Sequence, residues 1–476
     1  MRRLLRLECF RLFRDFRLYA GAALLLLLLS YGFKVRHSAI IDITAAMDTS
    51  RLHEERQFRS YITQLDSVSN YGKVVEKYDV DPRNPALYLN RAPKFAFIHL
   101  NALGILAHGQ SDLYNEEVLL TSRFRDPRQR NQDMVNPSVL EFGQFDAAMV
   151  LVILFPLFII ALSFNFLSAE KENGTIRLIA IHSGSIKKWI WAKTIVYGIA
   201  SFLVPWLICM ALFMIYNIDF ATNTVRIGFF SLILLCYTFL WQSLAVFINL
   251  SGRSSAFNAM FLVCLWVAFV FVLPAVSNLI ANQYHQVPSR VSFINAVRQA
   301  QVEAEKLDSS ELANRYFFDH PELVEKKDTV GQSRYAANEF AKQSILSQEI
   351  INKRANPVYE AYNHKLKEAN VFAGHVVWIS PSAAFNKALL ELAGTSSQDY
   401  FRFTDSATQF RAGFLQQTGD RILSDKELSY EEIINERKFS YQPAGNSGFI
   451  RILFAFILYL SILLWAVQKR VKNLTI

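Results

Sequence analysis

Cysteine is scarce in this chain of 476 residues, and it is missing from the segments where disulfides would matter most. No cysteine lies in either of the two long hydrophilic segments, 34–145 and 277–447. A disulfide framework within these segments is therefore excluded, and each must be stable through its own apolar core. The 4 cysteines are Cys9, Cys209, Cys236 and Cys264.

Three motifs of nucleotide binding and catalysis are also absent. The chain has no GxxxxGK[ST], no GxSxG and no HExxH, so it has no phosphate-binding loop of its own and no hydrolase signature. Its 9 histidines are scattered, and the hydrophilic segments contain only Met47 and Met134, so no copper or zinc site is indicated. We expect neither enzymatic activity nor a bound cofactor or metal in this chain.

Long apolar runs are what the sequence has in abundance. Apolar residues make up 52% of the chain and charged residues 19%, and 39 residues are Phe. Six runs approach the roughly 20 residues that a membrane-spanning helix needs. We therefore expect an all-α membrane protein with two mostly helical extracytoplasmic inserts that form one ectodomain. The expected boundaries are 1–17 (amphipathic interfacial helix), 18–33, 146–168, 190–217, 226–250, 255–276 and 448–467 (spans one to six), 34–145 and 277–447 (inserts), 169–189 (loop) and 468–476 (tail).

The basic residues favour one side of the membrane. The two chain ends, the segment 169–193 and the turn at Arg253 hold 15 Lys or Arg against 4 Asp or Glu. Since the whole chain carries +9, all the remaining segments together carry −2. By the positive-inside rule, both termini and the loop should be cytoplasmic and both inserts extracytoplasmic. Binding to nucleic acid is not expected, because the basic surplus lies beside the spans rather than in one patch.

The N-terminal 17 residues read as a helix in the headgroup plane of the membrane. Leu5, Cys9, Leu12, Phe13 and Phe16 recur at helical spacing, and most of the arginines lie on the other face. Such a helix would contact anionic lipid. The alternative is a plain cytosolic extension of the first span.

The inserts read as helices separated by Pro, Gly and Asn. In the first insert the pattern predicts helices over 38–68 and 116–122, and Asn136-Pro137 predicts an early start of the helix that becomes span two. No run of period two is long enough to predict a sheet. In the second insert the predicted helices are 289–306, 333–354, 358–369, 382–393, 398–417 and 429–437, with breaks at residues such as Pro357 and Gly419.

Few polar side chains interrupt the spans. Asn165, Gln242 and Ser243 either hydrogen-bond neighbouring helices or mark a substrate path. No Asp, Glu, Lys or Arg lies near the middle of a span, where an ion-coupled transporter would need one. The energy for any transport must therefore come from outside the chain.

The loop after span two reads AEKENGTIRLI from Ala169 to Ile179. Gly174 can adopt the backbone needed to end one helix and start another, and Thr175 can cap the new helix. The loop resembles the cytoplasmic loop of ABC transporter permeases of the type-2 (ABCG-like) export class. The resemblance implies a coupling helix that docks on a separate ATPase subunit, with Glu170, Glu172, Gly174, Thr175, Arg177 and Leu178 as the coupling residues.

A second resemblance lies in the second insert, in SPSAAF from Ser380 and LLELAGT from Leu389. This segment is similar to the branch of that class with large inserts between spans one and two and between spans five and six. The resemblance implies two ATPase subunits that bind ATP and Mg²⁺, a second permease copy or a sister permease, and a place in the bacterial inner membrane. A mechanotransmitter that moves nothing across the bilayer and acts on a periplasmic lipoprotein or peptide is the alternative. A membrane-anchored enzyme has no motif to support it.

Overall fold

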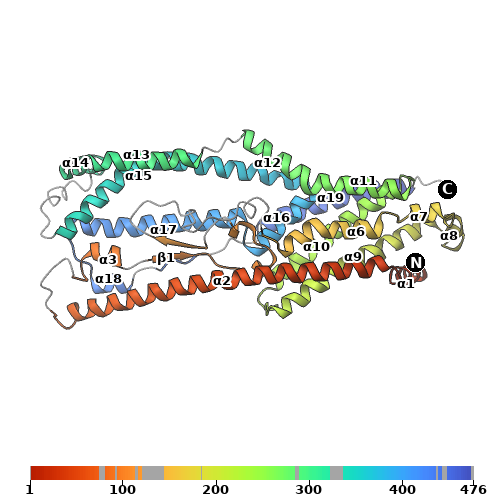
Figure 1. The fold of residues 1–476 in the computed structure, drawn as a ribbon, viewed down its shortest axis with the longest axis horizontal. Helices are drawn as coiled ribbons and strands as arrows, with labels where there is room; N and C mark the ends of the chain where they lie inside the picture. The colour runs from red at the N-terminus through yellow and green to blue at the C-terminus, as the bar shows by residue number, and fades with distance from the viewer. Residues whose placement is uncertain are drawn as a thin grey trace.

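The computed structural model describes residues 2–73, 81–91, 94–112, 116–120, 144–183, 185–284, 289–321, 336–435, 438–441 and 447–472. Within these ranges the chain is mostly helical and elongated. The apolar helices gather at one end together with both termini, and the helices of the inserts extend from the other end (Figure 1). The helix of span two begins at Ala147 with Asp146 as its N-cap, so the early start predicted from Asn136-Pro137 is wrong; those two residues themselves lie outside the described residues.

Six helical segments in the described ranges are long and apolar enough to cross a membrane, as the sequence predicts. Pro205 lies inside the third of them without ending it. Segments two and five each contain a short π-helical stretch, in which the backbone hydrogen bonds join residues five apart instead of four. The segments are α2 (Phe16–Ser69); α5 (Ala147–Met149), η4 (Val150–Leu154), α6 (Phe155–Ser163) and α7 (Ser168–Glu172); α9 (Ile186–Ile215); α10 (Thr224–Asn249); α11 (Ser255–Val267), η5 (Ala268–Val272) and α12 (Leu273–Tyr284); and α19 (Ser447–Lys472).

The first apolar segment does not end at the membrane boundary. Helix α2 runs without a break for 54 residues, which is about 80 Å at 1.5 Å per residue. Asp15 caps its start by accepting a hydrogen bond from the backbone N–H of Arg17. The sequence predicted a short first span over 18–33 that continues as helix beyond the membrane and a long helix over 38–68, and in the structure residues 34–37 join the two into one helix.

The first insert contains the two strands of the described structure. Strands β1 (Lys94–Phe97) and β2 (Glu117–Leu120) pair antiparallel, with Lys94 opposite Leu120. The helix predicted over 116–122 is therefore wrong, and the all-α expectation missed this pair. Four residues are too few for a period-two pattern to stand out from the sequence. The insert also holds α3 (Pro85–Arg91), η2 (Ala102–Leu106) and η3 (Gly109–Asp112).

The second insert is helical: the helices predicted over 333–354 and 358–369 form one helix, the one predicted over 398–417 is longer, and the one predicted over 429–437 is shorter. Pro357 does not break its helix, because Ala355 and Tyr359 on either side of it pack on Phe293 of a neighbouring helix and hold the chain in place. Gly419 likewise lies inside a helix rather than at its end. The helices are α13 (Arg290–Glu305), α14 (Ser309–Asp319), α15 (Ala336–Gly374), η7 (His375–Trp378), α16 (Pro381–Ala393), α17 (Ser397–Leu423) and α18 (Tyr430–Ile434).

The two inserts pack against each other. Tyr61 of α2 and Tyr88 of α3 share an apolar cluster with Phe414 of α17. The backbone N–H of Leu428 donates to the carbonyl of Arg83 at 2.8 Å. The largest apolar core, by contrast, belongs to the spans, and helix α16 of the second insert is part of it.

Candidate functional site

The loop between spans two and three reverses the chain at the end of the bundle that holds both termini (Figure 1). Helix α7 ends at Glu172, and α8 (Ile176–Ser183) begins four residues later. Gly174 between them has φ +70, the left-handed conformation that favours glycine. The bend predicted from Asn173-Gly174 is therefore present in the backbone.

Thr175 ties the two short helices together. Its hydroxyl donates to Oε2 of Glu170 at 2.5 Å and lies 3.1 Å from the carbonyl oxygen of the same residue. The side chain of Thr175 thus bonds back to α7. The hydrogen bonds between Thr175 and Glu170 thus link the two sides of the turn between α7 and α8.

Glu170 lies inside the structure rather than on its surface. Its residue is 3% exposed, and its carboxylate forms an ion pair with Arg11 of helix α1 (Arg2–Leu12). Oε1 also lies 3.9 Å from Nζ of Lys193 on α9. One carboxylate therefore joins α1, α7 and α9, and buried pairs of this kind are costly to break by removing one partner.

Lys193 is enclosed by aromatic rings at the start of span three. Its Nζ donates to the carbonyl of Phe166 at 2.8 Å. The same nitrogen lies 5.0 Å from the ring centres of Phe166 and Trp189 and 5.6 Å from that of Tyr197, within cation–π range. Sequence reasoning counted Lys193 only as a positive charge facing the cytoplasm.

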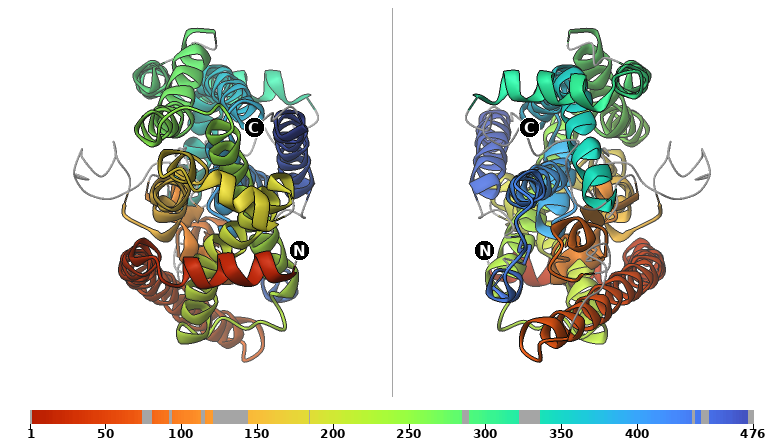
Figure 2. Two further views of the ribbon diagram at one scale, coloured as in Figure 1. Left: turned by 90° about the vertical axis from the view of Figure 1, so that its right-hand side faces the viewer. Right: turned by 90° about the vertical axis from the view of Figure 1, so that its left-hand side faces the viewer.

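Helix α1 lies across the ends of the spans (Figure 2, left), and two of its acidic or basic residues face inward. Besides Arg11, the buried Glu8 accepts a hydrogen bond from Nε1 of Trp189 at 2.7 Å. Leu12 is buried as well, whereas Phe13 and Phe16 are exposed and lie beyond the end of α1, so the helix predicted over 1–17 ends at Leu12 and its apolar face does not include them. Glu8 was detectable in the sequence as a lone acidic residue among the arginines of residues 2–14.

The chain between α1 and α2 is held by a short ion pair. Nη2 of Arg17 lies 2.6 Å from Oδ2 of Asp15, and this bond holds the pKa of Asp15 below its usual value. Nη1 of the same arginine donates to Oδ1 of Asn165 at 3.2 Å, which links the start of α2 to the end of α6.

Glu172 joins the loop to span five. Its carboxylate accepts the backbone N–H of Ser255 at 2.7 Å and the hydroxyl of Ser255 at 2.8 Å, at the first residue of α11. Lys171 donates to the carbonyl of Gly252 at 3.0 Å in the turn between spans four and five. The loop therefore contacts α1, α9 and the start of α11.

Helix α8 presents apolar side chains at the free end of the loop. Leu178 is 60% exposed and Ile181 is 79% exposed. Arg177 lies on the same helix, but its side chain is outside the described part of the structure. Exposed apolar residues on a short helix that is anchored at its base are typical of a docking surface for another protein.

The polar residues within the spans serve helix packing. Gln242 is fully buried and accepts a hydrogen bond from the hydroxyl of Ser163 at 2.9 Å. Ser243 is buried on the same helix, and Asn165 accepts a hydrogen bond from Arg17. Asn249, which sequence reasoning missed, accepts the backbone N–H of Leu167 at 3.1 Å and donates to the carbonyl of Ser163 at 3.1 Å. Over the described ranges, no group of three or more His, Cys, Asp or Glu residues is placed to hold a metal.

Comparison with protein families gives two matches along the chain. Residues 105–299 match the family described as ABC-2 family transporter protein, and residues 290–442 match a domain of unknown function (DUF3526). Comparison with curated proteins and with solved structures gave no significant match. The segment that contains the α7–α8 loop is thus similar to ABC-2 transporter proteins, and the segment that follows is similar to the DUF3526 domain. Permease subunits with this domain lack an ATPase, which is a separate protein, and the family typically binds no cofactor.

Proposed function

We propose that this chain, the membrane subunit of an ABC transporter by its ABC-2 domain, couples ATP hydrolysis by a separate ATPase to movement of its spans through the α7–α8 loop. The observation that carries the proposal is the construction of this loop. Its tip exposes Leu178 and Ile181, while its base is fixed to α1 and α9 through Glu170. A force applied at the tip is therefore passed on to several helices at once.

The residues expected to couple fall into two roles. Leu178 contacts the ATPase directly, with Arg177 beside it. Glu170, Glu172, Gly174 and Thr175 instead position the loop, because both carboxylates are already engaged with groups of this chain. Glu172 adds a connection to α11, so the loop also acts on span five.

The assembly follows from the family. Two ATPase subunits that bind ATP and Mg²⁺ would dock on two permeases, either two copies of this chain or one copy and a sister permease. The proposed location is the bacterial inner membrane, with the loop and both termini in the cytoplasm. The excess of basic residues at the end of the bundle that holds both termini supports this orientation.

The proposal is tested by identifying an ABC ATPase in a neighbouring reading frame and co-purifying the chain with it. Ile181→Asp and Leu178→Asp place a charge in the docking surface, and each should weaken ATPase binding by about tenfold or more. Phe318→Asp is the matched control, because Phe318 of α14 is 86% exposed at the far end of the molecule. If both loop variants bind the ATPase and stimulate its hydrolysis as the wild type does, the α8 tip is not the docking site.

A second candidate function is mechanotransmission without transport, in which the inserts act on a periplasmic lipoprotein or peptide. Helix α2 favours it, because a single helix runs from the first span to the far end of the first insert. The fifth span also continues without interruption as α12 to Tyr284. Both helices would carry movement of the spans directly into the inserts.

A further inference from the structure

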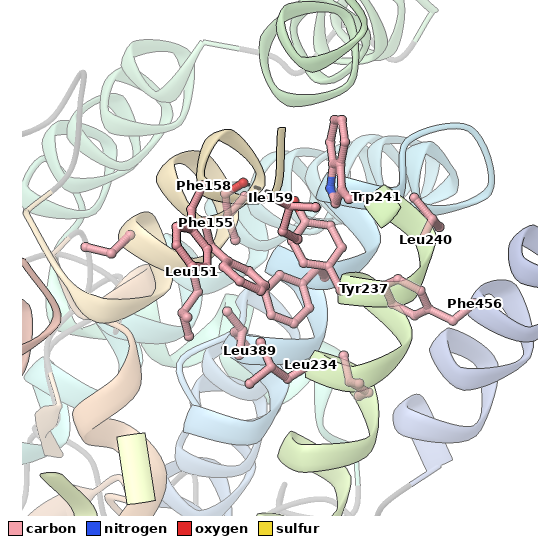
Figure 3. Packing of buried hydrophobic residues seen from close by; sticks show 14 of the residues in the cluster. Leu151, Phe155, Phe158, Ile159, Leu234, Tyr237, Leu240, Trp241, Leu389 and Phe456 are labelled. Atoms are coloured by element: carbon pink, nitrogen blue, oxygen red, sulfur yellow. Dashed lines mark hydrogen bonds between the residues drawn. The ribbon is translucent and has the colours of Figure 1, made fainter. Parts of the chain in front are cut away.

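Helix α16 belongs to the second insert by sequence but to the spans by packing. It bears the SPSAAF and LLELAGT motifs, and Phe385, Ala388, Leu389 and Leu392 are fully buried in the same core as the spans. Figure 3 shows Leu389 beside Leu151 and Leu234 in this core. Helix α16, which belongs to an insert, thus packs among the spans at the end of the bundle.

Tyr237 of span four makes the principal contact with α16. Its ring stacks on Phe385 with centroids 4.1 Å apart and an interplanar angle of 12°. Its hydroxyl lies 3.0 Å from Oγ of Ser382 on α16 and donates to the carbonyl of Val152 in span two at 3.0 Å. One tyrosine therefore joins α10, α16 and the second apolar segment, and it is surrounded by apolar residues of several helices (Figure 3).

The start of α16 is fixed to two more spans. Ser380, its N-cap, donates to the carbonyl of Phe269 in span five at 2.5 Å. Just before it, the carbonyl of Val377 accepts the hydroxyl of Tyr459 in span six at 2.5 Å. Spans four, five and six thus all bond to α16 or to the residues that lead into it, and span two is linked to it through Tyr237.

The end of α16 is fixed to the first insert. Gly394 caps the helix with φ +71, and a Cβ there would collide with the side chain of Asn101. The loop that follows Asn101 is held in turn by Arg36 of α2, which is fully buried and donates to the carbonyl of Gly104 at 2.9 Å. Asp146, at the start of span two, accepts the N–H of His108 in the same loop at 2.8 Å.

Helix α16 lies between two long helices of the insert. Helix α15 leads into it through the short η7, α17 follows it, and both long helices extend away from the spans toward the far end (Figure 1). The two helices are joined by Lys367, whose Nζ lies 2.7 Å from Oδ2 of Asp405. Any displacement of α16 therefore acts on the ends of α15 and α17 that lie next to it in the chain.

We infer that α16 is the element that transmits movement of the spans to the far end of the inserts. This inference rests on the proposed function, which supplies the ATP-driven movement. Tyr237 and Phe385 form the contact through which α10 displaces α16, and α15 and α17 carry the displacement outward. Tyr237 is a positioning residue, since it touches neither nucleotide nor ATPase.

The test measures movement of the far end in the complete complex with its ATPase, reconstituted in nanodiscs. Spin labels on Ser60→Cys of α2 and Asn314→Cys of α14, both exposed, report their separation by double electron–electron resonance. Cys9, Cys236 and Cys264 are replaced by Ser so that the labels are specific. The distance is compared without nucleotide and after trapping with ATP and vanadate.

We expect the distance to change on trapping in the wild type and the change to fall by at least half in Phe385→Ala. ATPase binding and hydrolysis should be retained in that variant. Asn386→Ala is the matched control, because Asn386 is the exposed neighbour on the same helix and should respond as the wild type does. Phe385→Leu keeps the apolar volume but loses the stacking, and it replaces Phe385→Ala if the latter does not fold.

The outcomes separate this inference from the proposed function. An undiminished distance change in the Phe385 variants, or no change in a wild type that hydrolyses ATP normally, overturns the role of α16 alone. Failure of the wild-type chain to bind the ATPase overturns the proposed function and this inference together.

Discussion

At the scale of single residues, the carboxylate of Glu170 decides how the loop is held. Its residue is 3% exposed, and it faces a guanidinium from α1 and an ammonium from α9. Removing its charge while keeping its shape leaves Lys193 buried without the opposing carboxylate. The same change at Glu172 removes only bonds at the start of α11, at a position exposed to water.

Glu170→Gln should therefore lower the free energy of unfolding by about 2 kcal/mol. This is less than the usual cost of breaking a buried ion pair, because the Arg11 side chain is 52% exposed. The substitution should also reduce stimulation of ATP hydrolysis, because α8 loses its fixed base. Thermal unfolding in detergent and ATPase assays of the complex measure the two effects. Glu172→Gln is the comparison and should unfold at a temperature closer to that of the wild type. Equal effects of the two variants would contradict the positioning role of Glu170.

At the scale of elements, α1 presents a buried face and a membrane face. Glu8 and Leu12 point into the structure, whereas Leu7 and Phe10 are 64% and 60% exposed, and Phe13 just beyond the helix is 56% exposed. The exposed apolar residues and the arginines together suit the boundary between headgroups and acyl chains. Since α1 also holds Glu170 through Arg11, lipid contact and the coupling loop are mechanically connected.

Replacing Arg2, Arg3 and Arg6 by Gln should weaken the dependence of the complex on anionic lipid, since each basic residue near such a surface contributes about 1 kcal/mol. The measurement is ATP hydrolysis by the complex in nanodiscs of neutral lipid and in nanodiscs that contain phosphatidylglycerol. The matched control replaces the exposed Arg51, Arg56 and Arg59 of α2, which lie far from the N-terminal end of that helix. A lipid response that is unchanged in the α1 variant, or equally reduced in the control, would argue against an interfacial role.

The elements also show where sequence reasoning succeeds and where it stops. The spans were predictable because long apolar runs have few alternatives to a membrane helix. The continuity of α15 through Pro357 was not predictable from the sequence. Ala355 and Tyr359 pack on Phe293 of another helix, and a local sequence pattern does not indicate such tertiary packing. The four-residue strands escaped for a related reason, since their pairing is set by a distant segment.

The candidate site was predictable in its backbone and not in its partners. Gly174 adopts the bend that Asn173-Gly174 indicated. The partners of Glu170, however, come from α1 and α9, and nothing in the spacing of Arg11 and Lys193 links them to residue 170. Their meeting depends on how α1 lies across the bundle, which is a property of the assembled helices.

At the scale of the whole molecule, the orientation in the membrane can be tested directly. Ser60 of α2 and Lys188 of α9 are exposed at opposite ends of the described structure. With Cys9, Cys236 and Cys264 replaced by Ser, Ser60→Cys should react with a membrane-impermeant maleimide in intact spheroplasts. Lys188→Cys should react only after the membrane is permeabilised. The reverse pattern would show that the inserts face the cytoplasm and would remove the basis for docking an ATPase at α8.

Because α2 is continuous, a small tilt of its membrane part produces a larger displacement at its far end. About 36 residues of this helix lie beyond the expected membrane boundary at residue 33, which corresponds to an arm of about 54 Å at 1.5 Å per residue. A tilt of about 5° within the bilayer would swing the far end of such an arm sideways by about 5 Å, by simple geometry on the same helical rise. A rotation too small to open a passage between spans can therefore produce a stroke as large as one helical turn outside the membrane.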